Sequence, residues 1–274
     1  MRVLVVGVLI LANVFIFSFA KERQLSVSFL DVGQGDSILI ESPTGVQVLI
    51  DGGADKAVLR ELGKKLSFFD RSIDMVIATH PDTDHVGGLS DVFERYDVGM
   101  FLESGVENDT AATKALEEAV ENEGTPRLLA RRGMRLLLGG GAYADILYPN
   151  KDVSRIETNA GSVVVRVVYG ENEFMLTGDA PKVIEGLLVS AYGDSLQSDV
   201  LKAGHHGSKT SSNPYFVEAV APHYVVYSRG CGNRYGHPAP ETVALFQKLS
   251  IPALDTCQSG TVVFRSNGRE LSIK

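Results

Sequence analysis

The amino-acid sequence predicts an α/β (α+β) protein, an αββα four-layer sandwich in which two mixed β-sheets pack together and helices lie outside them. The first observation is the order of the elements, because a strand-rich first part is followed by a part that mixes strands with helices. The second is the composition: 44% apolar and 22% charged residues are ordinary for a globular protein. The third is the length of 274 residues, which corresponds to one large domain or two small ones.

The first part of the fold is predicted from alternating apolar residues and turn residues. The strand 25–31 alternates and is followed by the turn Gly33-Gln34-Gly35, and Pro43-Thr44-Gly45 separates the next two strands. Asp109 is a candidate N-cap for the third helix. The predicted strands are 25–31, 36–41, 46–50, 74–79 and 98–102, and the predicted helices are 54–66, 89–96 and 110–122.

Strands and helices are mixed in the second part. Pro181 occupies the first turn of a predicted helix, a position that tolerates proline, and Asp179 comes just before it. The segment 149–161 is the best candidate for a connection between the two halves. The predicted strands are 135–138, 144–148, 162–169, 173–177, 199–203, 223–228, 253–255, 261–265 and a short last one, and the helices are 181–192, 214–220 and 240–249.

Residues 1–20 are predicted to lie outside the folded domain, which is expected to span residues 21–274. Arg2 precedes an apolar stretch that ends at Ser18-Phe19-Ala20, the pattern of a secretory signal peptide. The stretch is nearly long enough to span a bilayer, so an uncleaved membrane anchor is the alternative, and a buried first helix is the third. Both main alternatives place the domain outside the cytoplasm, secreted or anchored. Cys231 and Cys257 could pair in such an oxidising compartment.

The formal net charge of −8 excludes binding to nucleic acid through a broadly basic surface. Any contact with nucleic acid would need a local basic patch. An acidic chain is also suited to holding cations. No feature of the sequence indicates an obligate protein partner, and the first residues allow association with a membrane.

Four candidate metal ligands lie within six residues after a short apolar strand. The sequence is His80-Pro81-Asp82-Thr83-Asp84-His85, with Gly87-Gly88 permitting a tight exit. A loop at the end of a strand can direct several side chains into one cleft. Imidazole and carboxylate together suit divalent cations of intermediate to hard character. A polar surface turn is the alternative interpretation.

The motif His-x-Asp-x-Asp-His resembles the His-x-His-x-Asp-His signature of the metallo-β-lactamase superfamily, with Asp82 where the commoner pattern has histidine. The wider context resembles the extracellular metallo-β-lactamase-like domain of the ComEC family of DNA-uptake competence proteins. The resemblance runs from about residue 25 to 270 and implies the superfamily's αββα fold. The multi-helix membrane channel of that family is not found in this sequence. The blocks that resemble the family are 31–36, 51–53, 80–88, 176–179, 202–208 and 235–238.

The resemblance implies two metal sites. His80 and Asp82 would hold the first metal ion, and Asp84 and His85 would hold the second together with His205 or His206. Of these two histidines we favour His205, because it comes first after the predicted strand. Asp179 would bridge the two ions; its alternative role is to cap the following helix.

The superfamily's third histidine for the first metal ion is missing from this sequence. Asn159 lies in the matching stretch and could supply an amide oxygen; its alternative role is that of a turn residue. An oxygen-rich first site favours Mn²⁺ or Mg²⁺ more than an all-histidine site would, although Zn²⁺ stays a candidate. We therefore expect two divalent metal ions as cofactors.

Further residues are candidates for supporting the ligands or for binding substrate. Asp51 would orient a metal-binding histidine, since such histidines usually donate their second N–H to a partner. His237 is a candidate for contacting the substrate or protonating the leaving group, and an ordinary loop histidine is the alternative. Candidates near the ligands are Asp36 and Gln34, and candidates for holding a phosphate backbone are Lys202, Ser208, Lys209, Arg229 and Arg234.

Three functions remain open from the sequence. Two divalent ions about 3.5–4 Å apart can acidify a shared water, which makes a metal-bound hydroxide the expected nucleophile, with Asp84 orienting it. The ComEC resemblance implies a phosphodiesterase or DNase that acts on DNA outside the cell. The alternatives are a hydrolase of another small ester, lactone or amide, and a non-catalytic DNA-binding module of the same fold.

Overall fold

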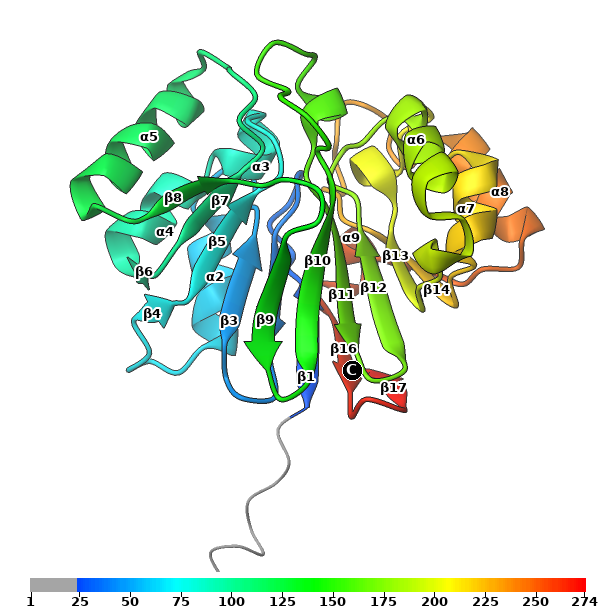
Figure 1. Cartoon of the computed structure of the whole chain (residues 1–274), viewed down its shortest axis with the longest axis horizontal. Coiled ribbons are helices and arrows are strands. Elements are labelled where there is room, and N and C mark those ends of the chain that lie inside the picture. The colour runs from blue at the N-terminus through cyan, green and yellow to red at the C-terminus, as the bar shows by residue number, and fades with distance from the viewer. Residues whose placement is uncertain (1–23) are drawn as a thin grey trace, which may run out of the picture.

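Two β-sheets lie face to face in the computed structural model, which describes residues 24–274 (Figure 1). The order of strands in the first sheet is β17-β16-β1-β2-β3-β5-β7-β8, and in the second it is β15-β14-β13-β12-β11-β10-β9. The first sheet contains β1 (Leu25–Phe29), β2 (Ile38–Glu41), β3 (Gln47–Ile50), β5 (Met75–Ala78), β7 (Phe101–Glu103), β8 (Arg127–Leu129), β16 (Val262–Ser266) and β17 (Leu271–Ile273).

The second sheet contains β9 (Arg135–Gly139), β10 (Ala142–Tyr148), β11 (Val164–Tyr169), β12 (Asn172–Leu176), β13 (Val200–Lys202), β14 (Tyr224–Tyr227) and β15 (Ala253–Asp255). A small parallel pair, β4 (Ser72–Ile73) and β6 (Asp97–Val98), lies apart from both sheets. The helices are α2 (Ala57–Lys65), α3 (Thr83–Val86), α4 (Leu89–Arg95), α5 (Ala111–Glu123), α6 (Lys182–Tyr192), α7 (Pro214–Val220), α8 (Pro240–Lys248) and α9 (Thr256–Ser259).

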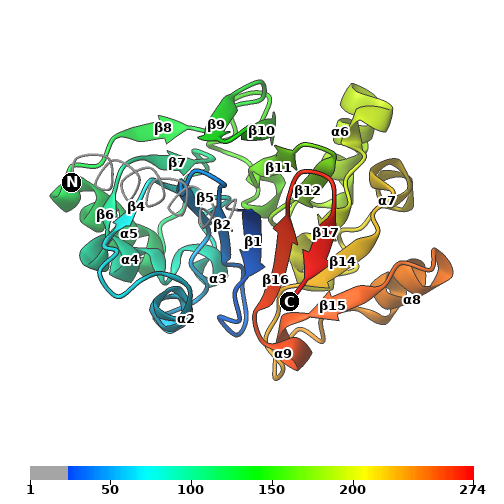
Figure 2. The ribbon, with the colours of Figure 1, turned by 90° about the horizontal axis from the view of Figure 1, so that it is seen from below.

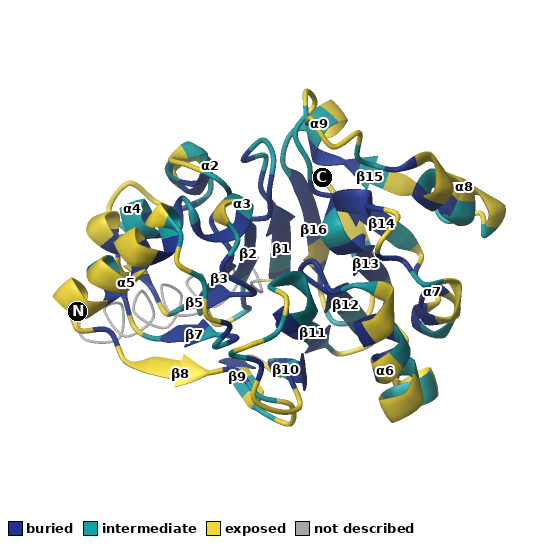
Figure 3. Ribbon diagram, turned by 90° about the horizontal axis from the view of Figure 1, so that it is seen from above, coloured by how far each residue is buried: buried dark blue, intermediate teal, exposed yellow. Residues whose placement is uncertain are grey.

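The alternation of side chains along the strands explains the layers. Ile38 and Ile40 of β2 join the core between the two sheets, whereas Leu39 joins the core under the helices α2, α4 and α5. In the same way Val165 of β11 faces the other sheet and Val164 faces the core under α6–α8. Figure 3 shows the buried strands between helices whose outer faces are exposed. The predicted αββα sandwich is therefore confirmed.

One prediction about the connections is wrong. The segment 149–161 does not join the two halves, because β10 and β11 on either side of it are antiparallel neighbours in one sheet. The chain instead passes from the first sheet to the second between β8 and β9, and returns to the first sheet with β16. The segment 149–161 is therefore a long loop that connects two neighbouring strands of the second sheet.

Three local predictions are also corrected. The helix α5 is capped by Thr110, whose side chain accepts a hydrogen bond from the backbone N–H of Thr113, and not by Asp109. The predicted strand 98–102 is divided between β6 and β7, and Thr83–Val86 within the predicted metal loop forms the helix α3.

The parallel strands position the site. The strands β3, β5, β7 and β8 run parallel in the first sheet, as do β12 to β15 in the second. The carboxyl ends of such strands lie along one edge, where open α/β sheets commonly bind ligands. His80, Asp179 and Lys202 all stand at or just after such ends.

Between residues 24 and 274 no helix combines the length and the apolar character that crossing a membrane requires. The segment 1–20, predicted to be a signal peptide or an anchor, lies outside the described residues.

Candidate metal centre

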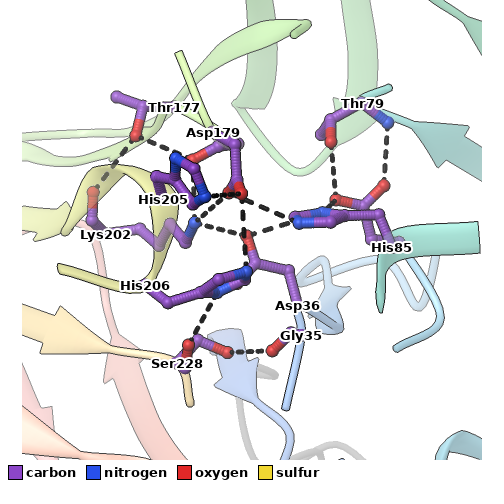
Figure 4. Close-up of polar contacts among 12 residues, drawn as sticks. Gly35, Asp36, Thr79, His85, Thr177, Asp179, Lys202, His205, His206 and Ser228 are labelled. Atoms are coloured by element: carbon purple, nitrogen blue, oxygen red, sulfur yellow. Dashed lines mark hydrogen bonds and ion pairs between the residues drawn. The ribbon is translucent and has the colours of Figure 1, made fainter. Parts of the chain in front are cut away.

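Side chains from both sheets converge on Asp179, which follows β12 (Figure 4). Its Oδ1 lies 3.3 Å from Nε2 of His85, and its Oδ2 lies 3.4 Å from Nε2 of His206. Nε2 of His206 in turn lies 3.2 Å from Oδ2 of Asp84. His85 and Asp84 come from the helix after β5, and His206 comes from the turn after β13, so the site joins the two sheets.

These distances suit a divalent metal ion. Zinc ligands at about 2.0–2.1 Å from a tetrahedral ion lie about 3.3–3.4 Å from one another, and the three distances above are 3.2–3.4 Å. The Nε2 atoms of His85 and His206 are buried and form no hydrogen bond of good geometry. Buried polar atoms are nearly always satisfied, and a metal ion would satisfy both. Donor atoms of Asp36, His85, Asp179 and His206 lie within 4.8 Å of one another.

The opposite nitrogen of each histidine is held by the protein. Nδ1 of His85 lies 2.7 Å from Oδ2 of Asp51, and Nδ1 of His206 lies 2.9 Å from the carbonyl oxygen of Ser228. Both partners accept a proton from Nδ1, which leaves Nε2 as the free lone pair for a metal ion. Asp51 is itself fixed, because it accepts hydrogen bonds from the backbone N–H and the hydroxyl of Thr79. This geometry agrees with the predicted role of Asp51, which is to orient a metal-binding histidine, here His85.

Burial and charge oppose each other in this cluster. Burial disfavours the charged form of His206, but Asp179 and Asp36 raise its pKa to about 9. Burial likewise opposes the charge on Asp179, yet His206, His85 and Lys202 hold the pKa of this carboxyl well below its usual range. Asp84 behaves in the same way, with its pKa lowered by His206 and His85 against the effect of burial. The carboxylates are therefore ionised and ready to bind a cation.

A second group of candidate ligands lies beside the first. The rings of His80 and His85 are 4.1 Å apart, and Nε2 of His80 lies 3.6 Å from Oδ2 of Asp82. The segment that carries Asn159 also reaches this group, since the neighbouring Thr158 is close enough to Asp82 to help lower the pKa of its carboxyl. Oδ1 of Asn159 is buried and has no hydrogen-bond partner, which is consistent with the predicted role of this amide oxygen as a metal ligand.

Both histidines of the 205–206 pair reach Asp179. Nε2 of His205 lies 3.6 Å from Oδ2 of Asp179, and its side chain is 27% exposed. His206 is fully buried and belongs to the cluster of ligand atoms, which gives it the geometry expected of the second metal's histidine. The sequence favoured His205 for this place. The structure brings both histidines to the site: His206 is buried at its centre, and His205 lies at the side that is exposed to solvent.

Lys202 has a different place from the predicted one. Its predicted role is to hold a substrate phosphate, but its side chain is fully buried. Its Nζ lies 2.5 Å from Oδ2 of Asp36, 3.3 Å from Oδ1 of Asp179 and 2.8 Å from the carbonyl oxygen of Gly178. Three acceptors therefore satisfy the three N–H groups of the ammonium. Lys202 fixes Asp179 and does not reach a substrate.

Asp36 is held between Lys202 and His206, with Oδ1 3.3 Å from Nδ1 of His206. Burial opposes its charge, but Lys202 and His206 lower its pKa to about 2. The turn that carries Asp36 packs tightly on the metal loop: a Cβ on Gly35 would lie 1.9 Å from the carbonyl oxygen of Asp84, so only glycine fits. Asp36 is predicted only to lie near the ligands, but in the structure it belongs to the cluster of potential ligand atoms itself.

The predicted substrate residues divide into buried and exposed ones. Ser208 is buried, and its hydroxyl accepts hydrogen bonds from Thr210 in the turn. Gln34 accepts a hydrogen bond from the backbone N–H of Gly230 and so joins its turn to the loop 229–237. Lys209 is exposed, and Arg234 is exposed within electrostatic reach of Asp84.

The loop 229–237 brings His237 to the site. The rings of His237 and His205 are 5.6 Å apart, and the ring of Tyr235 stacks on His237. Burial, then the neighbouring His205 and His206, lower the pKa of His237, so its neutral form dominates at pH 7. A neutral imidazole accepts a proton more readily than it donates one, which disfavours the predicted role in protonating a leaving group.

A disulfide joins Cys231 in this loop to Cys257 in α9, 26 positions further along the sequence. Replacing both cysteines with serine is expected to lower the free energy of unfolding by about 3 kcal/mol, because the bond restricts the unfolded chain. Urea denaturation of the oxidised protein, the reduced protein and the double variant measures this. Coinciding midpoints for the three samples would contradict the expectation.

Several residues of the site carry no signal in the sequence. Thr79 and Ser228 fix Asp51 and His206, and Asn108 donates its side-chain N–H toward Oδ1 of Asp82 at 3.5 Å. Ser228 and Asn108 lie far along the chain from their partners His206 and Asp82, in segments without a motif. Thr79 is also distant from its partner Asp51, but it directly precedes His80 in the metal loop. His80 and Asn108 also line a cavity of about 270 Å³ between the metal loop and α5.

Comparisons with known proteins agree with this geometry. A family model, described as the metallo-beta-lactamase superfamily, matches residues 30–142. ComE operon protein 3 of Bacillus subtilis is 31% identical over 261 residues, which cover 89% of this chain and 33% of that protein. Competence protein ComA of Neisseria gonorrhoeae is 31% identical over 244 residues, which cover 89% of this chain and 32% of that protein. The chain thus spans about a third of the length of these relatives.

A solved structure is similar in fold. CmlA, a diiron beta-hydroxylase from Streptomyces venezuelae, has a TM-score of 0.59 at 16% sequence identity, over 90% of this chain and 55% of that one. At this identity the likeness concerns the fold alone.

Proposed function

The chain contains a metallo-β-lactamase superfamily domain that is similar to part of the competence proteins, and from this premise we propose that it is a two-metal phosphodiesterase that cleaves DNA outside the cytoplasm. The family and the ligand cluster make it a metal-dependent hydrolase domain. The observation that supports the proposal most strongly is the convergence of carboxylates and buried histidine nitrogens on Asp179.

The charge of the site supports two metal ions. The side chains at the centre include five carboxylates, those of Asp36, Asp51, Asp82, Asp84 and Asp179, and one buried ammonium, that of Lys202. When the histidines are neutral, as metal-bound imidazoles are, four negative charges are left over, which two divalent cations would neutralise. A buried excess of negative charge is costly, so the protein is built to hold positive charge here.

The roles of the residues follow from their places. His85, His206, Asp84 and Asp179 would hold one ion, and His80, Asp82 and Asn159 would hold the other, with Asp179 between them. Divalent ions held by these residues would acidify a water molecule and would stabilise the negative charge of a phosphodiester during hydrolysis. Asp84, whose side chain is 29% exposed, faces the open side and can accept a hydrogen bond from that water. Arg234 and Lys209 are placed to contact phosphate.

Two observations support a place outside the cytoplasm. The Cys231–Cys257 disulfide is of a kind that persists in oxidising compartments and is rare in the cytosol. The apolar segment 1–20 has the pattern of a signal peptide or an anchor. DNA as the substrate rests on the similarity to competence proteins, whose matched part is about a third of their length.

The test is a cleavage assay with metal-depleted protein. We expect single-stranded or double-stranded DNA to be cleaved after addition of Mn²⁺, Mg²⁺ or Zn²⁺, and the Asp84→Ala variant to be inactive. Asp91→Ala is the matched control, because Asp91 lies on α4 in an ion pair with Lys56. Activity that needs no added metal, or that survives in Asp84→Ala, would contradict the proposal.

A second candidate is a hydrolase of a small ester, lactone or amide. The cavity of about 270 Å³ beside His80 favours it, since it combines apolar walls such as Phe101 and Leu116 with polar groups such as Thr113. Metal uptake with turnover of a small neutral substrate, but without DNA cleavage, would favour this function. Protein that takes up no metal would favour a non-catalytic binding module.

A further inference from the structure

We propose that the end of the sandwich where β1 begins rests on a lipid bilayer, with the loop Ser67–Asp70 inserted among the lipid headgroups. The proposal rests on the retention of segment 1–20 as a membrane anchor. Its first observation is the pair Phe68 and Phe69, which are 75% and 87% exposed. Exposed aromatic pairs in a loop are unfavourable in water and are typical of surfaces that bind another apolar phase.

The aromatic loop lies at the same end of the molecule as the start of β1. The side chain of Gln47, at the beginning of β3, donates a hydrogen bond to Asp70, and its backbone N–H donates to Asp74 just before β5. Ser26 of β1 pairs with Glu41, and Glu41 pairs with Gln47. The first residues of β1, β3 and β5 and the loop therefore share one end, which Figure 2 shows face on.

The length of chain before β1 places this end close to the bilayer. Only residues 21–24 separate the apolar segment from Leu25, the first residue of β1. Four extended residues reach about 14 Å at most, so an anchored chain cannot hold its domain far from the membrane. An end held that close brings Phe68 and Phe69 to the headgroup region, where aromatic side chains are favourable.

The charges beside the loop suit an anionic surface. Lys64 and Lys65 lie in the last turn of α2, one residue before the loop begins. Arg71 directly follows the loop and has its guanidinium 5.4 Å from the ring of Phe68. The side chain of Lys64 is 61% exposed, although its ammonium is also paired with Glu61. Long basic side chains can keep their charge among lipid phosphates while their stems contact apolar groups. The acidic Asp70 in the loop is bound to Gln47 and Ser72.

This orientation has a consequence for the site. The metal ligands follow the carboxyl ends of β5 and β12, and the proposed contact is at the amino ends of β3 and β5. In Figure 1 the carboxyl ends of β5 and β12 point toward the top and the start of β1 lies at the bottom. The site would then face away from the bilayer, toward large substrates in the surrounding medium.

The absence of tryptophan from the sequence permits a direct test. The full chain with Phe69→Trp is reconstituted in vesicles of phosphatidylethanolamine and phosphatidylglycerol, and its emission is compared with that of Tyr215→Trp. Tyr215 is 75% exposed in the first turn of α7, after the turn that carries the site histidines, and is the matched control. We expect the Phe69→Trp emission to shift to shorter wavelength and to lose at least half its intensity on brominated lipids.

The control is expected to keep the emission of a water-exposed indole. A double charge reversal, Lys64→Glu with Lys65→Glu, is expected to weaken the quenching of Trp at position 69. Equal quenching of both tryptophans, no quenching of either, or protein that fails to float with the vesicles would overturn the proposal. So would a dimer in detergent that buries position 69 without lipid. Hydrolysis is not measured here, so failure of this proposal is distinct from failure of the proposed function.

Discussion

Asp179→Asn is expected to reduce metal-dependent hydrolysis by at least about 10³-fold, a loss of about 4 kcal/mol of transition-state stabilisation. Asp179 lies 3.3–3.6 Å from the Nε2 atoms of His85, His205 and His206, so it is the carboxylate on which these three histidines converge, and the proposed function places it between the two ions. Asparagine keeps the size of the side chain but removes the charge and one of the two acceptor oxygens. Metal content per chain and initial rates at saturating metal measure the two effects separately.

Asp199→Asn is the matched control for this substitution. Asp199 accepts hydrogen bonds from Asn172 and from the backbone N–H of Glu173 at the amino end of β13, and it is not among the grouped metal-ligand residues. We expect this variant to keep its metal content and its rate. An Asp179→Asn protein that binds two ions and retains its rate would show that the bridging role is mistaken.

Lys202→Met is expected to lower the free energy of unfolding of the metal-free protein by about 3–5 kcal/mol. The substitution leaves the carboxylates of Asp36 and Asp179 buried without the ammonium that now lies between them. Urea denaturation in the presence of a chelator measures the loss. Added metal is expected to recover part of it, because a cation bound to Asp179 replaces some of the missing charge.

The double variant Lys202→Met with Asp36→Asn separates charge from packing. Removing one carboxylate together with the ammonium is expected to restore part of the lost stability, since fewer unpaired charges stay buried. Lys248→Met, at an exposed position at the end of α8, should change the free energy of unfolding by no more than about 0.5 kcal/mol. A Lys202→Met protein as stable as the Lys248→Met control would refute the proposed role of the buried ammonium.

Local patterns predicted much of this molecule. The strands and helices alternate as their apolar residues suggested, and helices such as α7 and α8 begin at the prolines that marked them. The metal loop was recognisable because His80, Asp82, Asp84 and His85 are close together in the chain. Asp179 and the 205–206 pair were recognisable because they follow strands in short motifs.

Other features depend on residues that are distant in the sequence. The three residues of β13, Val200–Lys202, are all buried, although a lysine at a strand end is normally expected to reach water. Lys202 is buried because Asp36, from the other sheet, lies opposite it. No local pattern predicts that pairing. The crossing between sheets at 130–134 was missed for the same reason, since strand order is a property of the whole sheet.

The sequence by itself determined the layers of the fold and the chemical class of the site, because side-chain periodicity and short ligand motifs are encoded locally. Only the tertiary structure decided which histidine is buried at the centre, which carboxylate is held by Lys202, and that Phe68 and Phe69 are exposed beside the start of β1. Burial and charge pairing arise where distant segments meet. Their energies therefore depend on the folded neighbours of each residue and not on its neighbours in the chain.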